Sequence, residues 1–154
     1  EDVKEWGIAA LHRAVKDLRC TTAVHICYGY GIEENLRWKE TLGNEWRQYE
    51  EIFPALNASR IGQVSLECAD SQVPLSLMGL LKDKEIMVGA VAVTSHKVET
   101  PAEVAATIRS AMQFVDAQRL LPCTNCGMAP IPYAVARAKL KSLAAGAALV
   151  RAEL

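Results

Sequence analysis

The sequence has 154 residues, of which 51% are hydrophobic, and its 17 basic and 18 acidic residues leave a net charge of −1. This composition is typical of a folded globular protein and argues against a disordered chain. Charges of both signs are interspersed, so we expect no nucleic-acid partner and no attachment to an anionic membrane. No apolar run approaches the roughly 18 residues of a membrane span, and the first residues are typical of an amphipathic helix rather than a signal peptide, so we expect a cytoplasmic protein.

Five cysteines, an odd number in a sequence without secretory features, favour metal binding or free thiols over a disulfide framework. The sequence also lacks an initiator Met and begins abruptly at EDVKEW. This beginning suggests that the chain is part of something longer.

In chain order, the first expected element is an amphipathic helix over 3–18, where apolar residues recur at three- and four-residue spacings. A short buried strand over 21–27 follows. Residues 33–49 show a second helical pattern, which Gly43 weakens, and the next strand is expected over 60–67.

The second half of the chain contains a clear helix start. Thr100 can serve as N-cap, followed by Pro101 and by Glu103 as the third residue of a capping box, which predicts a helix to about Ala117. The other expected elements are a short helix over 74–81, a third strand over 85–93, a fourth strand over 119–122, a loop over 123–128 and a final helix over 133–154.

Apolar strands thus alternate with helical patterns, and no linker or domain boundary interrupts them. This alternation predicts right-handed βαβ units and a parallel sheet covered by helices. Four such units are about half of an eight-unit barrel, whose usual length is roughly 250 residues. We therefore expect an α/β fold in which residues 1–154 form half of a (β/α)8 TIM barrel.

Possible metal ligands gather at the ends of the expected strands. His25 and Cys27 are two residues apart, so their side chains project from one face at the C-terminal end of a strand, where barrel active sites lie. Glu67 ends the next strand and Cys126 follows the fourth. An imidazole, two thiols and one carboxylate suit four-coordinate Zn²⁺ better than Mg²⁺ or Ca²⁺.

Other interpretations of these residues stay open. A strand histidine beside a cysteine is often packed core, and a glutamate that ends a strand is often a solvated rim residue. Cys123 and Cys126 form a single C-x-x-C, which could be a redox pair, although it does not open a helix as in thioredoxin-like folds. Cys123 could also replace Glu67 as the fourth ligand, which would make a closed structural zinc site.

The glycines of YGYG, Gly29 and Gly31, superficially suggest a phosphate-binding loop. Glu34 occupies the position of the third glycine in G-x-G-x-x-G, so the motif is incomplete. Backbone freedom after the strand is the favoured explanation.

The strings HICYGYG, SLECADS and PCTNCGM, with the segment from GAVAV to VETPAEV between them, resemble the zinc-site half of the cobalamin-independent methionine synthases. They look closest to the short, single-barrel form, and the resemblance covers essentially the whole chain. It implies that residues 1–154 are the second half of the catalytic barrel. The N-terminal half would then come from sequence outside this chain or from a partner chain.

The resemblance also implies a zinc-dependent methyltransferase that makes methionine from homocysteine. His25, Cys27, Glu67 and Cys126 would hold the zinc, and Glu67 would yield its place to the substrate thiolate. The methyl donor would be 5-methyltetrahydrofolate or a methyl-corrinoid. Two further hypotheses are a related alkyltransferase that activates another thiol, such as coenzyme M, and a non-catalytic module stabilised by zinc.

One segment departs from the pattern of the longer family members. They carry an Asp and, two residues later, a His after the glycine of the third strand, where this chain has Ala92 and Thr94. His96 lies two residues further on and could take the proton-handling role, or it could be a surface loop residue.

Overall fold

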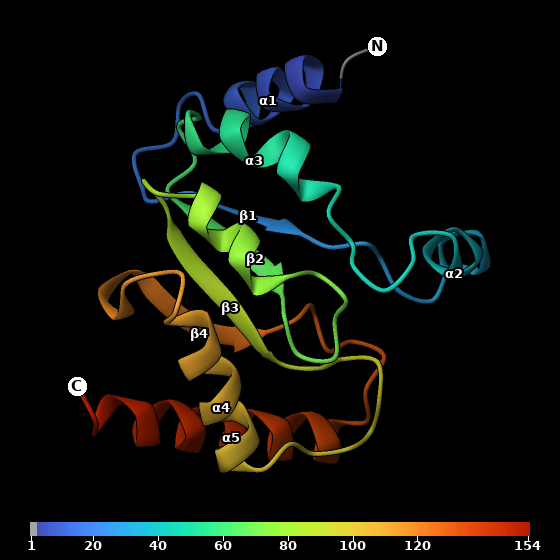
Figure 1. The fold of residues 1–154 in the computed structure, drawn as a ribbon, viewed down its shortest axis with the longest axis vertical. Coiled ribbons are helices and arrows are strands. Elements are labelled where there is room, and N and C mark those ends of the chain that lie inside the picture. Colours follow the sequence, from blue (N-terminus) through green and yellow to red (C-terminus); the bar gives the residue numbers. More distant parts are fainter. Residues whose placement is uncertain (1–2) are drawn as a thin grey trace.

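The computed structural model describes residues 3–154, in which strands alternate with helices (Figure 1). The strands are β1 (Ala23–Ile26), β2 (Gln63–Glu67), β3 (Glu85–Val91) and β4 (Leu120–Thr124). The α-helices are α1 (Val3–Ala14), α2 (Glu33–Glu40), α3 (Tyr49–Asn57), α4 (Pro101–Ala111) and α5 (Tyr133–Arg151), and two short 3-10 helices are η1 (Leu75–Leu80) and η2 (Ala117–Arg119).

The strands form one sheet in the order β1-β2-β3-β4, and each neighbouring pair is parallel. The predicted α/β fold with four parallel strands is therefore confirmed. Helices lie between consecutive strands in sequence, as parallel pairing requires. Because all strands run the same way, their C-terminal ends meet at one edge of the sheet.

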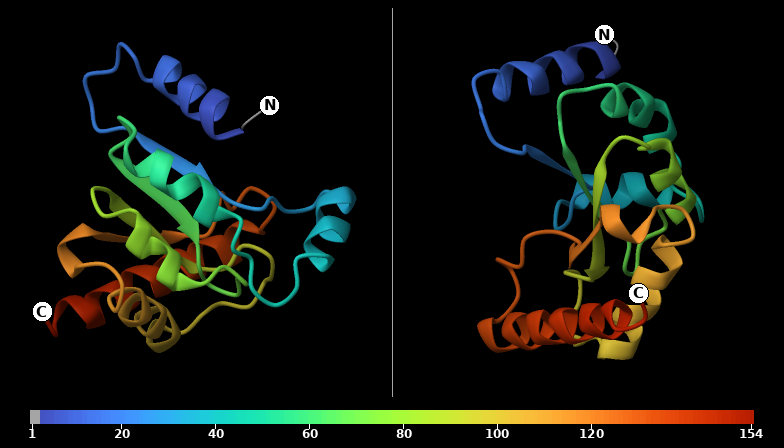
Figure 2. Two further views of the ribbon diagram at one scale, coloured as in Figure 1. Left: turned by 45° about the horizontal axis from the view of Figure 1, so that its top comes forward. Right: turned by 90° about the vertical axis from the view of Figure 1, so that its left-hand side faces the viewer.

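The two faces of the sheet differ in character. One face carries the buried side chains of Val64, Leu66, Ile86 and Val88, which belong to the same core cluster as Phe53 of α3. Figure 2 shows α3, η1 and α4 on this side. The opposite face carries His25, Ser65, Met87 and Leu121 in register, and His25 is exposed. A parallel sheet with helices on one face only is the arrangement expected of half a barrel, whose strands form the inner layer and whose helices form the outer ring.

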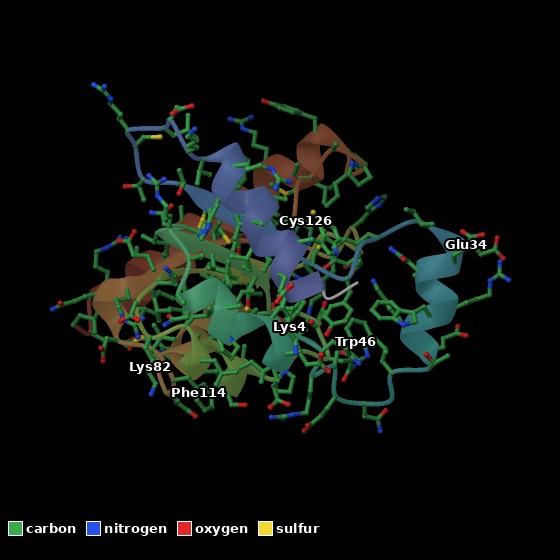
Figure 3. The ribbon with its side chains drawn as sticks, turned by 90° about the horizontal axis from the view of Figure 1, so that it is seen from above. Lys4, Glu34, Trp46, Lys82, Phe114 and Cys126 are labelled. Atoms are coloured by element: carbon green, nitrogen blue, oxygen red, sulfur yellow. The ribbon has the colours of Figure 1, made fainter. Side chains whose placement is uncertain are left out.

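The single helix predicted over 33–49 is wrong. Helix α2 ends at Glu40, Gly43 adopts a positive φ of 73°, and α3 begins only at Tyr49. A positive φ is incompatible with a continuing right-handed helix. In Figures 1 and 3, α2 with Glu34 stands apart from the sheet, and none of its residues is buried.

The other helices agree with the sequence except at their ends. The capping box is present: the Glu103 amide donates to Thr100 Oγ1, and Glu103 Oε2 accepts from the Thr100 amide at 2.7 Å. Helices α1 and α4 end earlier than expected, at Ala14 and Ala111. Within residues 3–154, no helix has the length and apolar character needed to cross a membrane.

A buried ion pair fixes the loop that follows β3. Lys139 of α5 is fully buried and places Nζ 2.9 Å from Oε2 of Glu99, which is itself nearly buried. The other carboxylate oxygen of Glu99 accepts from the Ala92 amide at 2.9 Å. Lys139 also donates to the Lys97 carbonyl. The pair therefore ties both ends of the 92–99 loop to α5.

Candidate metal centre

Three of the four proposed ligands come together at the C-terminal edge of the sheet. One donor atom each from His25, Cys27 and Cys126 lies within 4.8 Å of the other two. Donors at zinc-bond lengths of about 2.0–2.3 Å from a tetrahedral ion are roughly 3.3–3.8 Å apart. Small side-chain shifts would bring all three to this spacing. An imidazole nitrogen with two sulfurs is also a donor set that suits zinc, so the site fits such an ion.

Cys126 reaches this group because the chain after β4 crosses the strand ends. β1 and β4 are the outer strands of the sheet, and three interstrand spacings of about 4.8 Å would hold them roughly 14 Å apart. Asn125 links the ends of the two middle strands along this path: its amide donates to the carbonyl of Val91, the last residue of β3, at 2.8 Å, and its side-chain Oδ1 accepts from the Cys68 amide just after β2 at 3.0 Å. Its Nδ2 donates to Ala69 O at 2.6 Å.

Gly89 makes room for this crossing. A Cβ added at residue 89 would lie 2.4 Å from Asn125 Oδ1 and 2.6 Å from the Leu66 carbonyl oxygen. Both distances are too short for any real side chain. The absence of a side chain at Gly89 thus lets Asn125 pack over the strand ends, which places the next residue, Cys126, near His25 and Cys27. Neither Gly89 nor Asn125 was among the site residues predicted from the sequence.

Ser65 orients the histidine. Its Oγ lies 3.0 Å from His25 Nδ1, across the β1-β2 register that pairs the two residues. With Nδ1 protonated and donating to Ser65, Nε2 carries the lone pair and is free to face a metal. Metal-binding histidines regularly use one ring nitrogen in this way to fix their orientation. Ser65 was not singled out from the sequence, because strand pairing alone brings it to His25.

Replacing Ser65 with alanine is expected to weaken zinc binding by about tenfold to a hundredfold, the usual effect of losing such a supporting partner. Ser59→Ala is the matched control, because Ser59 is buried before the same strand but its hydroxyl bonds to the Leu56 carbonyl. Competition with a chromophoric chelator measures both affinities. Equal zinc affinities in the two variants would show that Ser65 does not orient His25.

Glu67 is buried at the end of β2, and both its oxygens have protein partners. Oε1 accepts from the Tyr28 amide at 2.9 Å, and Oε2 accepts from the Tyr30 hydroxyl. It therefore lies beside the metal group without being one of the three clustered donors. Its role as a ligand stays a prediction.

Several acidic groups are crowded in this region. Burial raises the pKa of the Cys27 thiol, and the neighbouring Cys126 and Glu67 raise it further. Burial and the hydrogen bond to Glu67 also raise the pKa of the Tyr30 hydroxyl. If these two thiols and the carboxylate are all ionised, their negative charges repel one another, and a bound cation would stabilise the ionised forms.

Cys123 and His96 lie outside the group. Cys123 belongs to β4 and not to the loop predicted there, and its Sγ lies 3.9 Å from Ser65 Oγ. Burial raises the pKa of this thiol. His96 is exposed in the loop after β3. The clustered donors among residues 3–154 thus include neither residue.

A half-barrel sheet with a His-Cys-Cys group at its C-terminal edge defines a βα-barrel protein with a candidate metal site, and comparisons give its family. The family model of the catalytic domain of cobalamin-independent synthases matches residues 46–148. A methionine synthase from Saccharolobus islandicus is 30% identical over 156 aligned residues, and one from Sulfurisphaera tokodaii is 25% identical over 150. The alignments cover 100% and 97% of this chain but 41% and 39% of those proteins.

A solved structure is similar over the same extent. The B12-independent methionine synthase from Shewanella sp. W3-18-1, in complex with selenomethionine, superimposes with a TM-score of 0.92 at 56% identity. The match covers 99% of this chain and 45% of that one. The chain belongs to the cobalamin-independent synthase family. It spans about two fifths of the length of the curated relatives.

Proposed function

We propose that this chain is the metal-binding half of a (β/α)8 barrel that makes methionine by transferring a methyl group to homocysteine. The observation that carries the proposal is the convergence of His25, Cys27 and Cys126 at the C-terminal edge of a parallel sheet. Barrel enzymes place their active sites at this edge. The names of the relatives and the selenomethionine bound to one of them support homocysteine as the methyl acceptor.

His25, Cys27 and Cys126 would hold Zn²⁺, with Glu67 as an exchangeable fourth ligand. Zinc bound there would lower the pKa of a coordinated substrate thiol and so supply a sulfur nucleophile at neutral pH. A free thiol with a pKa near 8.5 is only about 3% ionised at pH 7, so this gain is at most about thirtyfold. Exchange of Glu67 for a substrate thiolate replaces one anion by another and leaves the charge of the ligand set unchanged.

Most of the rate must therefore come from alignment of the methyl donor with the sulfur. The donor would be 5-methyltetrahydrofolate or a methyl-corrinoid, and its contacts would come largely from the other half of the barrel. That half would be supplied by sequence outside this chain or by a partner chain. His96, in the loop after β3, remains our candidate for proton handling, as a replacement for the residues of longer relatives.

Zinc K-edge X-ray absorption of the complete protein tests this function. Addition of homocysteine is expected to bring one further sulfur into the zinc shell. Coenzyme M serves as the comparison thiol, because a related alkyltransferase would bind it in place of homocysteine. A zinc shell that gains no sulfur from homocysteine would overturn the proposal.

A further inference from the structure

Tyr30 is the one side chain that reaches over Glu67 from the loop after β1, among the residues that the structure describes. Its hydroxyl donates to Glu67 Oε2, while the Tyr28 amide of the same loop donates to Oε1 at 2.9 Å. Each carboxylate oxygen thus has a donor from one short segment. A carboxylate that forms two such bonds is held in one orientation, and two of its roughly four lone-pair sites are occupied.

The loop is shaped to bring Tyr30 to this position. Gly29 and Gly31, on either side of Tyr30, have φ values of 76° and 77°, which a residue with a side chain rarely adopts. These two positive φ values change the direction of the chain around Tyr30, whose hydroxyl reaches Glu67 at the end of β2. The glycines that superficially suggested a phosphate loop therefore have a different structural purpose, and their backbone freedom is confirmed.

Helix α2 supports the same loop, although the helix itself is exposed. Asn35 Nδ2 donates to the Tyr28 carbonyl at 3.3 Å, and Lys39 donates to the Gly29 carbonyl. The Lys39 ammonium also lies 4.7 Å from the centre of the Tyr30 ring, within the range of a cation–π contact. Helix α2 thus holds both the backbone just before Tyr30 and the Tyr30 ring.

We propose that Tyr30 is a positioning residue that competes with the metal for the Glu67 carboxylate and so eases the exchange of this fourth ligand for the substrate thiol. The inference rests on the proposed function, since it concerns how readily Glu67 exchanges with that thiol. Tyr30 acts through Glu67 and forms no bond to substrate itself. Its hydroxyl sets the balance between a carboxylate bound to the protein and a carboxylate bound to zinc.

Tyr30→Phe in the complete protein gives opposite effects on two affinities. Loss of a hydrogen bond to a charged group frees Glu67 to compete for the metal, so the Kd for zinc falls and the Kd for homocysteine rises, each by about tenfold to a hundredfold. A merely structural disturbance would weaken both. Chelator competition measures the first, and calorimetric titration of the zinc-loaded protein with homocysteine measures the second.

Two further variants test whether Tyr30 acts through Glu67. In a Glu67→Gln background, Tyr30→Phe should change neither Kd, because the competing carboxylate is gone. Tyr49→Phe is the matched control, since the Tyr49 ring packs against Tyr28 in the loop that carries Tyr30, and its buried hydroxyl has no hydrogen-bond partner within residues 3–154. It should leave both affinities unchanged.

The outcomes separate this inference from the function on which it rests. Unchanged affinities in Tyr30→Phe, or a fall in both, would overturn the role of Tyr30 even if homocysteine sulfur enters the zinc shell of the unmodified protein. If no sulfur enters that shell, the proposed function fails instead. A tighter zinc affinity in Tyr30→Phe would then still show that the tyrosine restrains Glu67.

Discussion

In the complete protein, replacing Cys126 with serine is expected to weaken the proposed zinc binding by at least about a hundredfold and to abolish the proposed methyl transfer. Cys126 is one of three clustered donors, and a neutral serine hydroxyl is a much poorer zinc ligand than a thiolate. The loss should exceed the effect of removing a supporting residue such as Ser65. Metal analysis after dialysis of the complete protein, together with chelator competition, measures it.

Cys123→Ser is the matched control, since it removes a thiol three positions away that lies beside Ser65 and outside the group. This variant should keep its zinc. If it lost the metal while Glu67→Ala kept it, the site would be a closed structural one with three cysteines and a histidine. That result would favour a zinc-stabilised module without catalytic activity.

Lys139→Met is expected to destabilise the protein by about 3–5 kcal/mol, because it leaves the carboxylate of Glu99 buried without its counter-charge. The penalty reflects the uncompensated charge more than the strength of the pair. Urea unfolding followed by circular dichroism gives the free energy of unfolding. Adding Glu99→Gln to the same protein should recover part of the loss, since the buried charge is then removed.

Lys97→Met provides the comparison. Lys97 lies in the same loop and pairs with Glu103 at 2.7 Å, but both side chains are about half exposed. Exposed pairs of this kind contribute at most about 1 kcal/mol. A Lys139→Met protein as stable as Lys97→Met would contradict the buried ion pair, and with it the account of how the 92–99 loop is fixed.

Local patterns were enough to predict the parallel sheet and the clustering of three possible donors, whose role as ligands stays a prediction. His25 and Cys27 share a strand face because their spacing matches the strand period, and Cys126 follows the last strand. Helix α3 could not be predicted in the same way, because Pro54 lies inside it and a proline argues against a helix. The end of α2 at Glu40 was not predicted either.

The residues that position the possible donors could not be predicted from the sequence, for a different reason. Ser65, Asn125 and Tyr30 act through contacts with residues 30 or more positions away, and no local period reports such contacts. Asn125 stood beside a recognised ligand in the sequence, yet its importance depends on which strand ends it crosses. The possible donors could thus be predicted from the sequence, whereas the residues that position them could not.

The path of the chain over the strand ends also determines what a bound metal would report. His25 lies in the first strand and Cys126 beyond the last, so the donor group joins the two outer strands of the sheet. A metal bound between them would act as a cross-link that closes a loop of about 100 residues, which in a chain-entropy model is a large restriction on the unfolded state. An ion held by all three donors would therefore report that the outer strands have reached their native places.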